Sequence, residues 1–168
     1  MDRETLAELL IEVDTLSRNL NLPSYTLYIL GGSSCILNGY IQRGTMDIDI
    51  LDIEYPSSFG RLTRLLGEVD TLDWHLTTLS PDFADRATRL DWLSHLQVYT
   101  LSVEDIITSK LGRYSSKDKE DISYLGDYCN LELLFKLCES IINRVDLSPV
   151  IRERFIENYN RFRSDFNV

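Results

Sequence analysis

The chain has 168 residues and is 43% hydrophobic, which suits one domain of ordinary size with a sizeable core. With 17 basic and 27 acidic residues, its formal net charge of −10 opposes non-specific binding to nucleic acid, although a local basic patch could still hold RNA. It contains no run of about 18 apolar residues, and its start lacks the basic-then-apolar layout of a signal peptide, so we expect neither a membrane span nor a leader.

Predicted helices and strands alternate along the first part of the chain. Leucines and a valine at helical spacing predict an amphipathic helix over residues 2–20, which Pro23 ends. A β-rich segment over 25–30 runs into the turn at 31–34, whose serines can cap a short helix. Apolar spacing then predicts a helix over 57–69 and further strands over 46–54, 71–79 and 96–101.

From Ser102 onward the apolar residues have helical spacing. The sequence SVED is typical of a capping-box start, for a helix that Gly112 interrupts. Further helices are predicted over 115–128, 130–145 and 150–162. Strands with crossovers first and helices last predict an α/β or α+β fold with a C-terminal helical part.

The cysteines give a weak indication of the compartment. They are odd in number and lack the spacing of metal ligands, at Cys35, Cys129 and Cys138. Each lies among apolar residues, so we expect buried, reduced thiols and a cytoplasmic protein.

Two aspartates stand in the strand predicted over 46–54. Residues two apart in a strand point to the same side, so Asp47 and Asp49 project together while Met46, Ile48 and Ile50 face the core. Two neighbouring carboxylates repel each other, and burial raises that repulsion. A divalent cation removes it, and Mg²⁺ binds through one or two carboxylates together with substrate phosphates.

The glycine pair upstream supplies a place for those phosphates. A strand, a Gly31-Gly32-Ser33 turn and a helix start expose backbone N–H groups to an anion. Alone, two acidic residues at a strand end indicate a solvated edge, and a glycine pair indicates a turn. Together, in this order and at this spacing, they indicate a metal and nucleotide site.

These residues resemble the signature of the nucleotidyltransferase superfamily, most closely the AbiEii-like toxins and small domains of similar layout. The first motif comprises Gly31-Gly32-Ser33, Leu37, Gly39, Arg43, Thr45 and Asp47-Ile48-Asp49. A second motif, a helix lysine followed by a Lys-Asp-x-x-Asp cluster, matches Lys110, Lys117, Asp118 and Asp121. The resemblance covers about residues 25–125.

The resemblance implies a mixed sheet flanked by helices in a nucleotidyltransferase-like domain over 1–125, with C-terminal helices over 126–168 packed on it. It assigns the phosphates to the turn at 31–33 and Mg²⁺ to Asp47 and Asp49. Arg43 and Thr45 would brace the aspartate strand.

In the second motif, the resemblance assigns Lys110 to the triphosphate and Asp118 to a further acidic role, as a base or beside the metal. From the residues alone, each is equally an ordinary helix residue, with Asp118 favoured by the helix dipole. Superfamily members often use a third carboxylate on a neighbouring strand, and either Asp73 or Asp118 could supply it.

The predicted function is metal-dependent transfer of a nucleotidyl group from an NTP to an RNA, protein or small-molecule acceptor. The resemblance adds a toxin-like role, with an antitoxin protein as a partner. The alternative is a regulatory module that keeps the fold and the nucleotide site without turnover.

Overall fold

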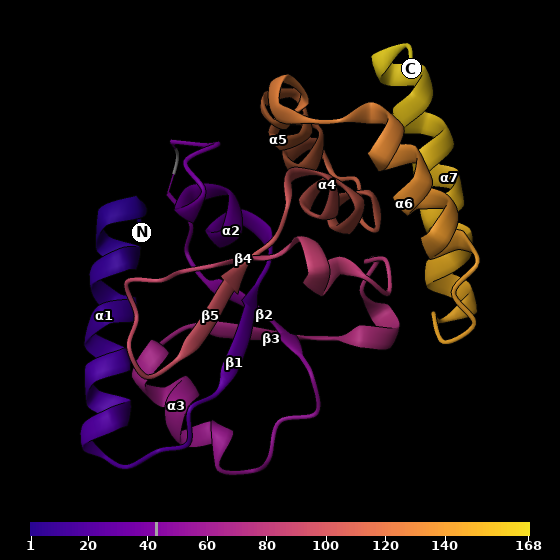
Figure 1. Cartoon of the computed structure of the whole chain (residues 1–168). Coiled ribbons are helices and arrows are strands. Elements are labelled where there is room, and N and C mark those ends of the chain that lie inside the picture. Colours follow the sequence, from indigo (N-terminus) through magenta and orange to yellow (C-terminus); the bar gives the residue numbers. More distant parts are fainter. Residues whose placement is uncertain (43) are drawn as a thin grey trace. The chain divides into compact units, whose positions relative to one another are not determined.

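The computed structural model describes residues 1–42 and 44–168, and Figure 1 shows the chain. Over these residues the chain forms a five-stranded sheet in the order β3-β2-β1-β5-β4. Strand β1 pairs antiparallel with β2 and parallel with β5, and β4 pairs antiparallel with β5. This mixed sheet confirms the predicted α/β class. The strands are β1 (Thr26–Ile29), β2 (Ile48–Asp52), β3 (Val69–Asp73), β4 (Thr88–Arg89) and β5 (Gln97–Thr100).

The helices follow the predicted order along the chain. In the described residues they are α1 (Arg3–Asn19), α2 (Gly31–Leu37), α3 (Phe59–Leu66), α4 (Val103–Leu111), α5 (Ser116–Leu125), α6 (Leu131–Ile142) and α7 (Pro149–Phe166). Short 3₁₀ helices are η1 (Trp74–Leu76), η2 (Phe83–Arg86) and η3 (Gly126–Tyr128). None of the helices described here has the length and apolar character that crossing a membrane requires.

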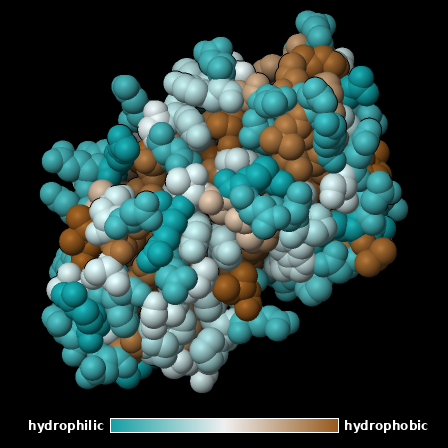
Figure 2. Space-filling view, in the orientation of Figure 1, coloured by the Kyte–Doolittle hydropathy of each residue, from teal (hydrophilic) through white to brown (hydrophobic). Residues whose placement is uncertain are grey.

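The chain divides into two compact units. The first comprises residues 1–72 and 87–101, and the second comprises residues 73–86 and 102–168. The expected division at residue 125 stays a prediction. On the face seen in Figure 2, hydrophilic residues cover much of the surface, with hydrophobic ones between them.

In the first unit, one face of the sheet packs against helices. Leu6 and Leu10 of α1 and Leu62 of α3 form a core with Ile29 of β1 and Ile50 of β2, and all five are fully buried. Burying such side chains contributes about 1.5–3 kcal/mol each. The helix spacing predicted from the sequence therefore does place the apolar face of α1 on the sheet.

Asp14 of α1 holds the connection from β4 to β5. This buried carboxylate accepts hydrogen bonds from the backbone N–H groups of Ser94, His95 and Leu96, at 3.2, 2.9 and 2.7 Å. Burial alone would raise the pKa of Asp14, but these backbone hydrogen bonds outweigh it and lower the pKa. The carboxylate therefore stays charged while it orders the loop.

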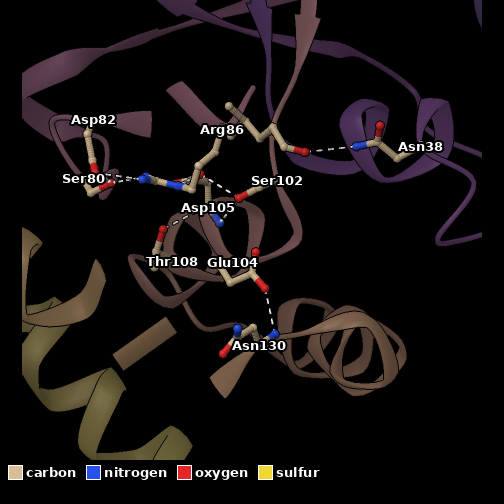
Figure 3. Close-up of polar contacts among 10 residues, drawn as sticks. Asn38, Ser80, Asp82, Arg86, Ser102, Glu104, Asp105, Thr108 and Asn130 are labelled. Carbon is tan, nitrogen blue, oxygen red and sulfur yellow. Dashed lines mark hydrogen bonds and ion pairs between the residues drawn. The ribbon is translucent and has the colours of Figure 1, made fainter. Parts of the chain in front are cut away.

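In the second unit, α4 contacts α6 and α7, and Ile106, Leu134 and Phe155 are fully buried there. Figure 3 shows the polar cluster at the start of α4. The guanidinium of Arg86 donates two hydrogen bonds of 2.9 Å to Asp105, whose side chain is fully buried. Ser102, the N-cap of α4, donates to the same carboxylate at 2.7 Å.

The strand predicted over 71–79 is wrong beyond Asp73, where η1 begins. Buried Arg144 explains the change, because it donates to the carbonyl oxygens of Trp74, Thr77 and Leu79 at 3.1, 2.8 and 3.0 Å. Those carbonyls are hydrogen-bonded to a side chain, so this segment does not need strand partners to satisfy them.

The cysteines are shielded from solvent to different degrees. Cys35 and Cys138 are buried, and Cys129 is half-buried. Burial raises the pKa of the Cys129 and Cys138 thiols to about 12, so both stay protonated at neutral pH. Neither thiol is therefore suited to act as a nucleophile.

Candidate functional site

The first unit brings three carboxylates together at one edge of the sheet. Oxygen atoms of Asp47, Asp49 and Asp70 all lie within 4.8 Å of one another. Asp47 directly precedes β2, Asp49 lies in it, and Asp70 lies in the neighbouring strand β3. The first two are half-buried and Asp70 is exposed. Carboxylate oxygens are the ligands that Mg²⁺ and Ca²⁺ prefer, so this group has the chemistry of a cation site.

The alternation predicted for the aspartate strand is present from Ile48 onward. Ile48 and Ile50 are fully buried in the core of the first unit, while Asp49 lies on the other face of β2. Met46, which the period-two pattern places in the core, is instead 85% exposed. The reason is that β2 begins only at Ile48, so the alternation does not extend back to Met46.

The glycine turn is built around Asp49. Gly31 has φ +57°, and a Cβ atom there would lie 2.0 Å from Oδ2 of Asp49, which no side chain can tolerate. The Leu30 N–H donates to the backbone oxygen of Asp49 at 2.9 Å. Glycine is therefore favoured at position 31, because φ is positive there and because the Asp49 carboxylate lies against the turn.

Two hydroxyl groups hold the residue Asp47 in place. Ser33 is buried and its Oγ donates to the backbone oxygen of Asp47 at 2.8 Å. Thr45 donates to the same oxygen at 3.1 Å, and its Oγ1 lies 3.4 Å from the carboxylate of Asp47. Thr45 thus has the bracing contacts expected of it, while Arg43 lies outside the described residues.

Asp70 is the acidic residue that the sequence reasoning missed. The predicted strand began at Thr71, whereas β3 begins at Val69 and so includes Asp70. Asp70 and Asp73 are three residues apart in one strand, so their side chains point to opposite faces. Asp73 caps η1 instead, accepting the N–H of His75 at 2.7 Å. The sequence gives no clear signal for it, because apolar and polar residues do not alternate over 69–73.

Three residues of the second motif, Lys110, Asp118 and Asp121, form a buried ion cluster in the second unit, while Lys117 is exposed. The Nζ of Lys110 lies 2.5 Å from Asp121 and 3.7 Å from Asp118. Lys110 is 6% exposed, and both aspartates are buried. Lys110 is therefore not the solvated helix residue that a lone lysine usually is.

Asp118 is held from several sides. Arg113 donates to both of its oxygens at 2.8 and 2.9 Å, and Ser115 donates its N–H and hydroxyl at 2.9 and 2.7 Å, completing a capping box on α5. Burial acts to raise the pKa of Asp118, but the hydrogen bonds from Arg113 and Ser115 prevail and lower it to about 2. A carboxylate with so low a pKa is a weak base, so these contacts favour a positioning role for Asp118.

Comparisons with known proteins agree with this geometry. A family model described as "Nucleotidyltransferase of unknown function (DUF6036)" matches residues 4–166. No curated protein and no solved structure matches the chain significantly. The match confirms the predicted relation to the nucleotidyltransferase superfamily, while the closeness to AbiEii-like toxins stays a prediction.

Proposed function

Because the chain belongs to the family of nucleotidyltransferases of unknown function (DUF6036), we propose that it uses Mg²⁺ and a nucleoside triphosphate to modify an acceptor hydroxyl. Asp47 and Asp49, with Asp70 beside them, would hold the cation. The acceptor class is an RNA end, a protein side chain or a small molecule that carries a hydroxyl group.

The observation that carries the proposal is the clustering of like charges. Carboxylate oxygens within 4.8 Å of one another repel when all three groups are ionised. A divalent cation turns this repulsion into attraction, and it neutralises the negative charge that develops around the attacked phosphorus.

The turn beside the carboxylates supports binding of the phosphates. The hydroxyl proton of Ser33 is used on the backbone of Asp47, so a phosphate here would meet the backbone N–H groups of Gly32 and Ser33. Gly31 lets Asp49 approach this turn closely. A cation on Asp49 and phosphates on the turn would therefore be neighbours.

In the reaction, the acceptor hydroxyl oxygen forms a bond to the α-phosphorus. The bond from that phosphorus to the bridging oxygen breaks, pyrophosphate leaves with the electron pair, and the hydroxyl proton passes to water or to a carboxylate. The chain mainly positions the reactants, with Ser33 and Thr45 fixing Asp47 and the turn fixing the phosphates.

The direct test is a transfer assay with NTPs labelled on the α-phosphate, in Mg²⁺ and in chelator, across RNA, protein and small hydroxyl acceptors. We expect label transfer only with the cation, and its loss in Asp49→Asn. Calorimetry that shows no NTP binding in either condition would refute the proposal. NTP binding without turnover on any acceptor would favour the non-catalytic regulatory module.

A matched pair of variants identifies the third carboxylate. Asp70→Asn removes an oxygen from the cluster, whereas Asp73→Asn changes the other face of the same strand. We expect Asp70→Asn to weaken Mg²⁺-dependent activity by roughly tenfold or more and Asp73→Asn to leave its Mg²⁺ dependence unchanged. The opposite result would show that Asp73, and not Asp70, is the third carboxylate.

The toxin-like role and the antitoxin partner rest on the resemblance, and the cytoplasmic setting rests on the cysteines; all three stay predictions. So do the nucleotide roles of Lys110 and Asp118. Growth arrest on expression that depends on Asp49, and relief by the product of a neighbouring gene, would support the toxin-like role.

A further inference from the structure

The sheet face that carries the carboxylates also carries two aromatic side chains. Ile29 of β1 lies opposite Ile50 of β2, and both belong to the core. The residues next to them therefore point to the other face, which places Tyr28 on the same side of the sheet as Asp49. Both side chains belong to the first unit.

The same face continues across β5 and β4. Tyr28 is in register with Tyr99, and their rings are 5.2 Å apart between centroids with planes inclined by 32°. Tyr99 in turn pairs with Arg89 on β4. Paired residues project to the same side of a sheet. Asp49, Tyr28, Tyr99 and Arg89 therefore form a row across the sheet, with one residue on each of the strands β2, β1, β5 and β4.

The spacing of this row suits one nucleotide. Leu30 lies opposite Asp49, with its N–H bonded to the oxygen of Asp49, so Tyr28 is a diagonal neighbour of Asp49. Diagonal neighbours of this kind lie about 7–8 Å apart, and Tyr99 lies one strand further, about 4.8 Å from Tyr28. A ribose joins an α-phosphate to its base over a similar short span, so a base would reach the tyrosines.

The two tyrosines are more accessible than the residues around them. Leu27 and Val98 on the core face are fully buried, and so are Leu30 and Leu51 beside Asp49 on the other face, whereas Tyr28 and Tyr99 are only half-buried. Partial burial and the neighbouring Tyr99 raise the pKa of Tyr28, so its hydroxyl is neutral at neutral pH and adds no charge to the acidic face. Aromatic side chains on adjacent strands are a platform on which nucleic acid bases stack.

We propose that Tyr28 and Tyr99 bind the base of the nucleoside triphosphate whose phosphates lie at the Asp47–Asp49 cation. Arg89, exposed at the far end of the row, donates to acceptor atoms on the edge of that base. The inference rests on the proposed function and adds to it the residues that distinguish a nucleotide from a bare polyphosphate.

A second aromatic site in the same unit provides the rival location. A pocket of about 350 Å³ is lined by Arg3, Glu4, Ala7, Leu37, Leu90 and Trp92. Trp92 is 47% exposed, and it lies in the connection from β4 to β5 rather than in the row of the tyrosines. Trp92→Leu is therefore a matched control, since it removes an accessible aromatic ring away from that row.

The test is calorimetry in Mg²⁺ with ATP, GTP and inorganic tripolyphosphate, which carries the phosphates without a base. We expect at least one purine NTP to bind more tightly than tripolyphosphate. Tyr28→Leu and Tyr99→Leu should each weaken the binding of that NTP by about 5- to 100-fold and change the affinity for tripolyphosphate by no more than about twofold. Tyr28→Phe, which keeps the ring, should bind like the wild type, and so should Trp92→Leu. An unfolding curve of each variant confirms that it is folded.

The outcomes separate this inference from the proposed function. If the NTP and tripolyphosphate bind equally well, or if only Trp92→Leu weakens the NTP, the tyrosine platform is refuted and the cation site stands. If neither ligand binds the wild type in Mg²⁺, the proposed function itself fails, and the inference fails with it. Equal losses of both ligands in Tyr28→Leu would show that Tyr28 supports the sheet rather than the base.

Discussion

Acidic side chains have different surroundings in the two units. In the second unit, Asp105, Asp118 and Asp121 lie 2.9, 2.8 and 2.5 Å from a nitrogen of an arginine or lysine. In the first unit, Asp47, Asp49 and Asp70 lie within 4.8 Å of one another, so each faces other carboxylates. A carboxylate beside a cationic group of the same chain stabilises the fold. Carboxylates this close to one another repel, and a bound divalent cation would remove that repulsion.

Asp14 shows that the difference is not simply one of location. It lies in the first unit, but three backbone N–H groups donate to it, so its charge is stabilised within the fold. The groups that contact a carboxylate, and not the unit in which it lies, therefore distinguish the structural acids from the candidate metal ligands. The clearest experiments change one group of each kind and compare the stability of the variants.

The largest effect is expected for Lys110→Met in the second unit. The substitution removes the cation from buried Asp121 and Asp118, and breaking a buried pair in this way costs about 3–5 kcal/mol. Urea unfolding of the variant measures the loss. The control is Lys136→Met, which breaks an exposed pair with Glu132 on α6 and should match the wild type within error. Equal stability of the two variants would show that the ion pairs of Lys110 do not stabilise the fold.

An intermediate effect is expected for Asp118, and it depends on pH. The pKa of Asp118 is lowered to about 2 from 3.8, so its contribution to stability is fully present above pH 4 and is lost as the pH falls toward 2. The shift corresponds to about 2 kcal/mol. We expect Asp118→Asn to be less stable than the wild type at pH 7, with the difference shrinking between pH 4 and pH 2. Unfolding measured at pH 7, 4 and 3 checks this, and a constant difference would contradict it.

The sequence predicted the carboxylate cluster of the first unit better than the buried ion cluster of the second unit. The period-two pattern and the glycine turn identified Asp49 and Gly31, because strand alternation and close backbone approach are local properties. Asp70 was missed because the predicted strand started two residues too late, at Thr71 instead of Val69, where β3 begins. A boundary of that kind depends on which strand lies alongside, and the sequence does not display it.

The ion cluster of the second unit was harder to foresee. Lys110 and Asp121 are eleven residues apart on different helices, and each alone reads as a solvated helix residue. Their burial follows from how α4 and α5 pack, which apolar spacing indicates only roughly. Likewise, Arg144 lies far along the chain from Thr77 and Leu79, whose carbonyls it binds, so the end of β3 could not be predicted from the local pattern.

The smallest and most decisive effect concerns Asp47→Asn and Asp49→Asn without metal. At 4.8 Å and an effective dielectric near 20, two carboxylates repel by about 3 kcal/mol, which salt and solvent reduce to about 1 kcal/mol. In chelator, each variant should therefore be as stable as the wild type or up to about 1 kcal/mol more stable. In Mg²⁺, the wild type should gain stability from binding the cation, and the variants should gain less.

Asp105→Asn is the counterpart from the second unit for this last experiment. It removes a charge that Arg86 and Ser102 satisfy, so it should destabilise the chain equally in chelator and in Mg²⁺. Urea unfolding of all three variants in both conditions gives the comparison directly. Clear destabilisation of Asp47→Asn and Asp49→Asn in chelator would place these aspartates with Asp105 as parts of the fold. The distinction between an acid that stabilises the fold and one that repels its neighbours until a cation binds would then fail at the site on which the proposed function depends.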